Sequence, residues 1–188
     1  MDFNIGGYLD VQWNNNFRQP NTTASPNSGT STTATTTSNQ ANRNNRGRVF
    51  DDEDGTFAVN AFELNFENAA ENVKEAGFRT DIQFGEDAAI VNADGGTADK
   101  VDLQQAYVEY IAPGFEAGGI LPSSVKLTAG RFVTLAGAEV SEAPSNWNVS
   151  RSFLFGYAVP FTHTGVRTNF GLFNDFLDTY IGLNNGWD

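Results

Sequence analysis

The chain offers little for catalysis that depends on cysteine or histidine. It contains no Cys and a single His, so thiol catalysis is excluded, and a hydrolytic triad would need His163 with Ser150 or Ser152. No G-x-S-x-G turn is present to expose such a serine. His163 lies on the polar side of a predicted strand, where a hydrogen bond to a carboxylate or a loop carbonyl accounts for it. We therefore predict that the protein is not an enzyme and uses no cofactor.

An acidic run made of Asp51, Asp52, Glu53 and Asp54 precedes Gly55. Oxygen ligands of this kind can hold Ca²⁺ or Mg²⁺, and such an ion could bridge to lipopolysaccharide phosphates. The spacing departs from that of a calcium-binding loop, which favours a solvated run of charge. Because Cys/His zinc sites are also excluded, the sequence predicts no metal site.

Charged residues of both signs recur at alternate positions of several segments, so they share one side of each segment. On a wall that faces water, such residues keep their hydration, and their field selects among solutes. With the charged residues of one long connection and the histidine, they form the predicted set of pore-lining and constriction residues. This set is Asp10, Glu63, Arg79, Asp81, Glu109, Lys126, Arg131, Glu139, Glu142, Arg151, His163 and Arg167.

The segments that carry these residues alternate apolar with polar residues, which is typical of β-strands. From Phe3 to Trp13 the odd positions are mainly apolar and the even positions mainly polar. Asn60 falls on the apolar side of a second such segment, so we expect a bulge or a late start there. Seven strands are predicted, over 3–13, 57–66, 78–84, 103–111, 125–133, 163–170 and 177–184.

The connections between these strands alternate in length, which predicts an antiparallel meander with long loops at one rim and tight turns at the other. The first long loop carries a Thr/Ser/Asn-rich insert that cannot bury enough apolar surface to become ordered, so we expect a mobile outer loop. The long connections occupy about 14–55, 86–101 and 134–161, and the shorter ones about 67–76, 112–124 and 171–176.

The connection over 134–161 is too apolar for a freely solvated loop of its length, so it must pack on something. We predict that it folds inward and narrows the channel, with Glu139 and Glu142 opposite basic wall residues. Opposed charges across a narrow pore orient dipolar solutes and penalise apolar ones. The alternative is that the charged residues of this loop only cap the rim and pair with one another. The basic wall residues are Arg79, Lys126, Arg131 and Arg167.

Alternation alone fits either a soluble β-sandwich or a membrane barrel. A tilted strand as long as Phe3–Trp13 spans roughly 25 Å, the height of a lipid-facing band, whereas ordinary strands have about five or six residues. Aromatic residues stand at the ends of the apolar sides, where the two membrane interfaces would lie. The charged residues share the opposite side, as a water-filled lumen requires. These features favour the barrel.

A β-structure in lipid must close on itself, and bacterial single-chain barrels have an even number of strands. The seven strands over 1–188 therefore predict an incomplete up-and-down transmembrane β-barrel, from which we expect an export signal and the closing strands to be missing. The net charge of −12 opposes binding to nucleic acid. No apolar stretch is long enough for a membrane-spanning helix.

The most specific segment is AGRFVTLAGAEVSEAPSNWNVSRSFLFGYAVPFTHTGVR, over 129–167. Weaker ones are GGYLDVQW (6–13), RVFDDEDGTFAVNAFEL (48–64), GFRTDIQFG (77–85), QAYVEY (105–110) and NNGWD (184–188). On these segments the sequence resembles the OmpL-like β-barrel porins of bacterial outer membranes. The resemblance implies a diffusion channel with its N-terminus in the periplasm and its long loops outside the cell.

We therefore expect a bacterial outer-membrane channel for passive diffusion of small hydrophilic solutes or ions, with a mild cation preference from its acidic surplus. The expected partners are these solutes, outer-membrane lipid and lipopolysaccharide, with a homotrimer as the candidate assembly and no nucleic acid. The alternative is a secreted or periplasmic β-sandwich that binds carbohydrate through Trp13, Trp147 and Trp187.

Overall fold

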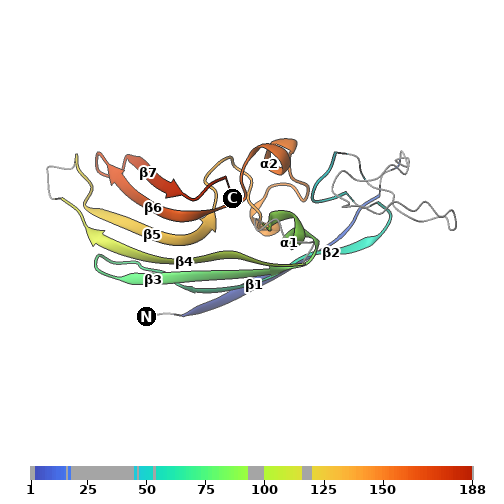
Figure 1. The fold of residues 1–188 in the computed structure, drawn as a ribbon, viewed down its shortest axis with the longest axis horizontal. Coiled ribbons are helices and arrows are strands. Elements are labelled where there is room, and N and C mark those ends of the chain that lie inside the picture. Colours follow the sequence, from blue (N-terminus) through green and yellow to red (C-terminus); the bar gives the residue numbers. More distant parts are fainter. Residues whose placement is uncertain are drawn as a thin grey trace.

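The protein is represented by a computed structural model (Figure 1). The structure describes residues 3–15, 17, 45, 47–52, 54–92, 100–115 and 120–187. The prediction of a mobile loop over 14–55 falls mainly outside the described residues.

In the described part of the chain, seven antiparallel strands form one sheet in chain order. Every predicted strand is confirmed, with its ends within two residues of those expected. The sheet curves but is not closed, so it fits the predicted incomplete barrel (Figure 1). A β-sandwich needs a second packed sheet, and the described residues form only this one. The strands are β1 (Asn4–Trp13), β2 (Phe57–Asn68), β3 (Ala76–Phe84), β4 (Val101–Pro113), β5 (Ser124–Val133), β6 (Thr162–Leu172) and β7 (Leu177–Asn184).

Two β-bulges among the described strands change which side of the sheet the following side chains face. On β2, Asn60 is the extra residue that has no partner in β1, which confirms the expected bulge. On β4, Gln104 is the extra residue that has no partner in β3. An extra residue shifts the register by one, which moves the following side chains to the other side of the strand. The two bulges therefore decide which residues of β2 and β4 share the polar side.

The two sides of the sheet are exposed in the opposite sense to those of a water-soluble protein. On β1 the apolar Ile5 and Leu9 are 66% and 64% exposed. On the opposite side of the sheet, Glu63 of β2 is 1% exposed, and Asp81 and Gln83 of β3 are both 0% exposed. Apolar side chains thus point away from the protein, and polar side chains point to its covered interior.

Long connections meet at one rim of the sheet, where they carry α1 (Glu86–Val91), a 3₁₀ turn η1 (Ala143–Ser145) and α2 (Phe153–Ala158). The segment 86–101 was predicted to be a loop, and its first part is this short helix α1. The helices lie at the long-loop end of the sheet (Figure 1). A hydrophobic cluster joins them to the end of the first connection, so the segment over 134–161 is packed, as its apolar content predicted. The cluster contains Phe50, Val91 and Phe155, with Val49, Ile90, Val159 and Phe161 packed against it.

Aromatic rings stand at both ends of the outward side. At the short-turn end, the Phe3 ring lies 6.4 Å from that of Phe66 and 6.2 Å from that of Phe78. At the long-loop end, the rings of Trp13 and Phe57 are 6.3 Å apart. Among the described residues, no helix is long and apolar enough to cross a membrane.

Candidate functional site

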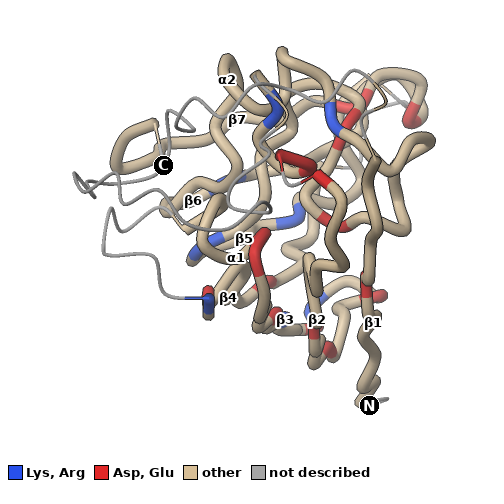
Figure 2. Tube along the Cα trace, turned by 90° about the vertical axis from the view of Figure 1, so that its right-hand side faces the viewer, with Lys and Arg blue, Asp and Glu red and all other residues tan. Residues whose placement is uncertain are grey.

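Basic and acidic residues both occur along the strands (Figure 2), and several of them form ion pairs. Arg79 Nε lies 2.9 Å from Asp81 Oδ2, and Lys126 Nζ lies 3.1 Å from Glu109 Oε2. Asp81 also accepts a hydrogen bond from Gln105 Nε2. Because each cation of these pairs is partly exposed and each acid is buried, the wall combines fixed charge with access to water.

Arg131 lies where β4 and β5 stop pairing, since its pair with Ala106 is the last between the two strands. Arg131 Nη2 lies 3.4 Å from Asp102 Oδ1, and Nε donates to Thr162 Oγ1 over 3.3 Å. Both charged side chains are largely buried. Asp102 thus balances a wall cation that the sequence analysis had placed opposite the loop acids.

Arg167 is held by aromatic rings. Its guanidinium carbon lies 4.3 Å from the ring centroid of Phe132 and 5.9 Å from that of Tyr180. No carboxylate among the described residues lies within ion-pair distance of it. A guanidinium over an aromatic face is attracted by the ring. Arg167 is therefore held in place by neutral groups, and no carboxylate among the described residues neutralises its positive charge.

Two further residues of the predicted set have neutral partners. Asp10 Oδ2 accepts a hydrogen bond from Gln12 Nε2 over 2.8 Å. His163 Nε2 lies 3.3 Å from Thr134 Oγ1. The His163 contact is a hydrogen bond to a loop-end hydroxyl, where a carboxylate or carbonyl had been expected.

Within the connection over 134–161, Glu142 reaches the wall. Its carboxylate oxygen lies within 4.8 Å of carboxylate oxygens of Glu63 and Asp81. Burial raises the pKa of Glu142, and the positive charge of Arg79 acts in the opposite direction. The structure therefore places Glu142 beside two acids, with Arg79 as the neighbouring cation, whereas the sequence predicted only basic residues opposite it.

Glu139 is held inside the same connection. Its carboxylate accepts hydrogen bonds from the backbone N and the hydroxyl of Ser152, the residue that caps the N-terminus of α2. The Ser152 hydroxyl in turn accepts a hydrogen bond from Phe155 N over 3.2 Å. Glu139 thus stabilises the start of α2, and the structure does not bring it to the basic wall residues.

Arg151 ties the connection to α1. It is 4% exposed, and its Nη2 lies 3.5 Å from Asp87 Oδ2. Nη1 donates to the carbonyl of Val149, and Nη2 donates to the carbonyl of Ser141. Its guanidinium also lies 4.8 Å from the ring centroid of Phe50. Arg151 is therefore an internal anchor of the loop. Burial raises the pKa of its partner Asp87 to about 7, although Arg151 opposes the shift.

Comparison with known protein families agrees with this architecture. The family model described as "Putative beta-barrel porin-2, OmpL-like" matches residues 2–188. The chain belongs to this porin family. Neither the curated proteins nor the solved structures contain a match. Membership in the porin family implies an outer-membrane location.

Sequence reasoning missed several buried polar residues of the porin chain, and three of them show why. Asp102 lies just outside the predicted strand over 103–111, and Gln104 is the unpaired residue of a bulge. Asp87 lies on α1, in a segment predicted to be a loop. In each case the signal depends on strand register or on tertiary packing, which the order of residue types does not record.

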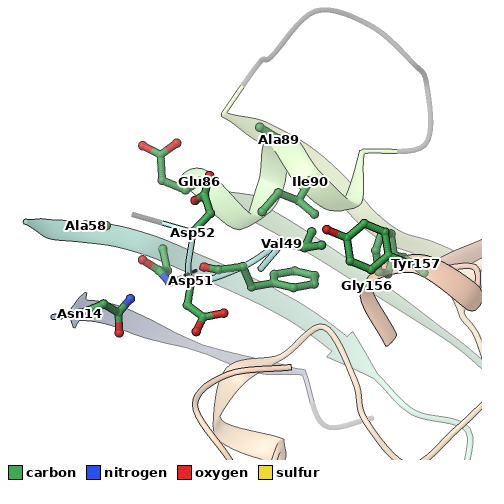
Figure 3. A pocket seen from close by; sticks show the side chains of 13 residues that line it. Asn14, Val49, Asp51, Asp52, Ala58, Glu86, Ala89, Ile90, Gly156 and Tyr157 are labelled. Carbon is green, nitrogen blue, oxygen red and sulfur yellow. Dashed lines mark hydrogen bonds between the residues drawn. The ribbon is translucent and has the colours of Figure 1, made fainter. Parts of the chain in front are cut away.

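The acidic run borders a cavity of about 550 Å³ at the long-loop rim of the porin chain. Figure 3 shows Asp51 and Asp52 beside this cavity, together with Glu86 of α1 and Tyr157 of α2. Asp51 Oδ1 lies 2.8 Å from Arg48 Nε, so part of its charge is balanced. Glu53 lies outside the described residues.

Proposed function

We propose that the protein is a channel through which small hydrophilic solutes or ions diffuse passively across the outer membrane. The observation that carries the proposal is the inverted exposure of the sheet, with Leu9 and its neighbours outward and Glu63 and Asp81 inward. An outward apolar side suits lipid, and an inward polar side suits a water-filled lumen. Family membership supports the same conclusion.

The proposed mechanism needs no nucleophile. Ion pairs along the wall keep charge at fixed positions. As a solute passes, these charged groups replace part of its hydration shell. Glu142 on the inward loop and Arg79 on the wall supply opposite charges close to each other. We propose that this pair narrows the path and orients dipolar solutes, and that the acidic surplus gives a mild cation preference. Lipopolysaccharide around the rim and a homotrimer are further parts of the proposal.

The channel is tested by inserting detergent-extracted protein into planar lipid bilayers. We expect stepwise increases in current whose size follows the conductivity of the salt solution, because a water-filled pore conducts like its bath. A preparation heated until the barrel unfolds is the control. Folded protein that inserts without current steps would contradict the channel.

The role of the loop is tested with Glu142→Gln. Removing this charge should lower the cation preference, measured as the reversal potential in a salt gradient, and change the single-channel conductance. The matched control is Glu71→Gln, because Glu71 is an exposed acid in the short turn at the opposite rim. Equal reversal potentials and conductances for wild type and both variants would remove the constriction role and leave the channel itself standing.

A further inference from the structure

The feature that the channel does not explain is a buried group of acids between the wall and the loop. Carboxylate oxygens of Glu63 on β2, Asp81 on β3 and Glu142 on the connection over 134–161 all lie within 4.8 Å of one another. Glu63 and Asp81 are 1% and 0% exposed. Like charges this close in a buried place repel each other strongly unless a positive charge compensates them.

The protein supplies only part of that compensation. Arg79 donates to both carboxylate oxygens of Asp81, over 3.1 and 2.9 Å. No other Lys or Arg among the described residues forms an ion pair with Glu63, Asp81 or Glu142. Three carboxylates and one guanidinium leave a formal charge of −2, which one divalent cation would neutralise.

Two fully buried side-chain oxygens, one on an acid of the group and one on its cross-strand neighbour, have no hydrogen-bond partner among the described residues. They are Glu63 Oε2 and Gln83 Oε1. Glu63 and Gln83 are direct cross-strand partners, so their side chains share the polar side. The Tyr8 hydroxyl accepts a hydrogen bond from Gln83 Nε2 over 3.2 Å, and Tyr8 stands opposite Glu63 in the register of β1 and β2. This contact uses the amide nitrogen of Gln83 and leaves its carbonyl oxygen for another partner.

We propose that Glu63, Asp81 and Glu142 bind a calcium ion, with the Gln83 carbonyl oxygen as a further ligand. Ca²⁺ takes carboxylate and amide oxygens at about 2.4 Å, so two ligands on opposite sides of it are about 4.8 Å apart. Mg²⁺ requires shorter distances and a stricter geometry, which a site built from two strands and a loop does not favour. The ion would join the loop over 134–161 to the barrel wall.

This inference does not depend on the channel, since an ion that fixes the loop could bind whether or not solutes pass. The test uses protein refolded into detergent from inclusion bodies, which keeps lipopolysaccharide phosphates out of the sample, and stripped of metal with EDTA. Tb³⁺ is the probe because it prefers the same oxygen ligands as Ca²⁺ and luminesces when a nearby tyrosine such as Tyr8 is excited. Added CaCl₂ should displace it.

We expect one saturable Tb³⁺ site in the wild-type protein that Ca²⁺ empties. Glu142→Gln and Glu63→Gln should each weaken Ca²⁺ binding by roughly 10-fold to 100-fold, because each removes a charged ligand. Glu139→Gln is the matched control, since it removes an acid from the same loop without touching the site, and it should keep wild-type affinity. The slower electrophoretic mobility of each barrel after heating shows whether the variant had folded.

Two results would overturn the proposal. One is the lack of a saturable site in folded wild-type protein, which would mean that protons compensate the acids. The other is equal Ca²⁺ affinity in wild type, Glu63→Gln and Glu142→Gln. Glu63 lies on β2 and Glu142 lies in the connection over 134–161. If one variant fails to fold, the Ca²⁺ affinity of the other variant still tests the proposal.

Discussion

Asp87 and Arg151 form a buried ion pair between α1 and the connection over 134–161. Arg151 Nη2 lies 3.5 Å from Asp87 Oδ2, and each side chain is 1% exposed. A buried pair gains Coulomb energy but loses the hydration of both groups. For Asp87 the lost hydration dominates, since its pKa in the folded protein is about 7 against the ordinary 3.8. The docked loop should therefore respond to pH.

The sign of this response follows from the raised pKa. The folded protein binds the Asp87 proton more tightly than the unfolded chain does, so this contribution to stability is complete below about pH 3.8 and is lost as the pH rises through about 7. We expect amide hydrogen exchange over 134–161, corrected for its intrinsic pH dependence, to reveal more frequent opening at about pH 8 than at about pH 5. Asp87→Asn should reduce this difference. Glu139→Gln should keep it, and an undiminished difference in Asp87→Asn would contradict the assignment.

At the residue scale, the sequence predicted which charges share a side but not which of them pair. Lys126 and Glu109 were both assigned to the wall from the two-residue period. Their contact depends on the register of β4 and β5, in which Glu109 stands opposite Thr128 and Lys126 opposite Ile111. The ion pair is thus a diagonal contact, and no pattern within either strand specifies that register.

At the element scale, Gly130 gives β5 a backbone conformation that a side chain would strain. Its φ of +133° lies in a region that L side chains rarely adopt, and an added Cβ would lie 2.2 Å from the carbonyl oxygen of Ala106. Gly130→Ala should therefore lower the free energy of unfolding by about 2 kcal/mol or more. Urea unfolding in lipid vesicles, followed by tryptophan fluorescence, measures it.

The control for this prediction is Gly182→Ala on β7. There an added Cβ would have Val166 O as its nearest neighbour, at 3.5 Å, which is an ordinary contact. Both variants add the same methyl group to a strand. Only at Gly130 does this group meet a close carbonyl oxygen and an unfavourable φ, so only Gly130→Ala should be destabilised. Similar unfolding curves for the two variants would mean that the backbone at Gly130 adapts to a side chain.

The strands were predictable because their signal is local and repeats along each segment, whereas α1 was not. A helix of six residues, Glu86–Val91, is too short to display a 3.6-residue period. What stabilises it is tertiary packing, in which Val91 lies in the cluster with Phe50 and Phe155. These partners of α1 are about forty and sixty residues away in the sequence. Because the local sequence does not record such contacts, the segment over 86–101 was predicted to be a loop although it contains a helix.

At the scale of the whole molecule, the open sheet and the outward position of its apolar side chains both indicate that lipid surrounds the strands. The edge strands β1 and β7 each leave one side of the backbone without a strand partner in the described sheet. In hydrocarbon such groups must be paired, so a working barrel needs further strands beside them. Apolar side chains along β1 are exposed over its whole length, with aromatic rings at both ends. This distribution fits a lipid band with an interface at each rim.

The identity of that medium decides the proposed function, and a single outward charge can test it. Leu9 stands in the middle of β1 and is 64% exposed, so in water Leu9→Arg would cost little. In lipid near the midplane, the same change should lower the free energy of unfolding by roughly 2–4 kcal/mol. Asn169→Arg, on the inward side of β6, is the matched control, because a lumen position keeps a new charge hydrated. Urea titrations in vesicles compare the two, and equal stability of both variants would mean that water or protein surrounds Leu9, in which case the strands do not line a membrane channel.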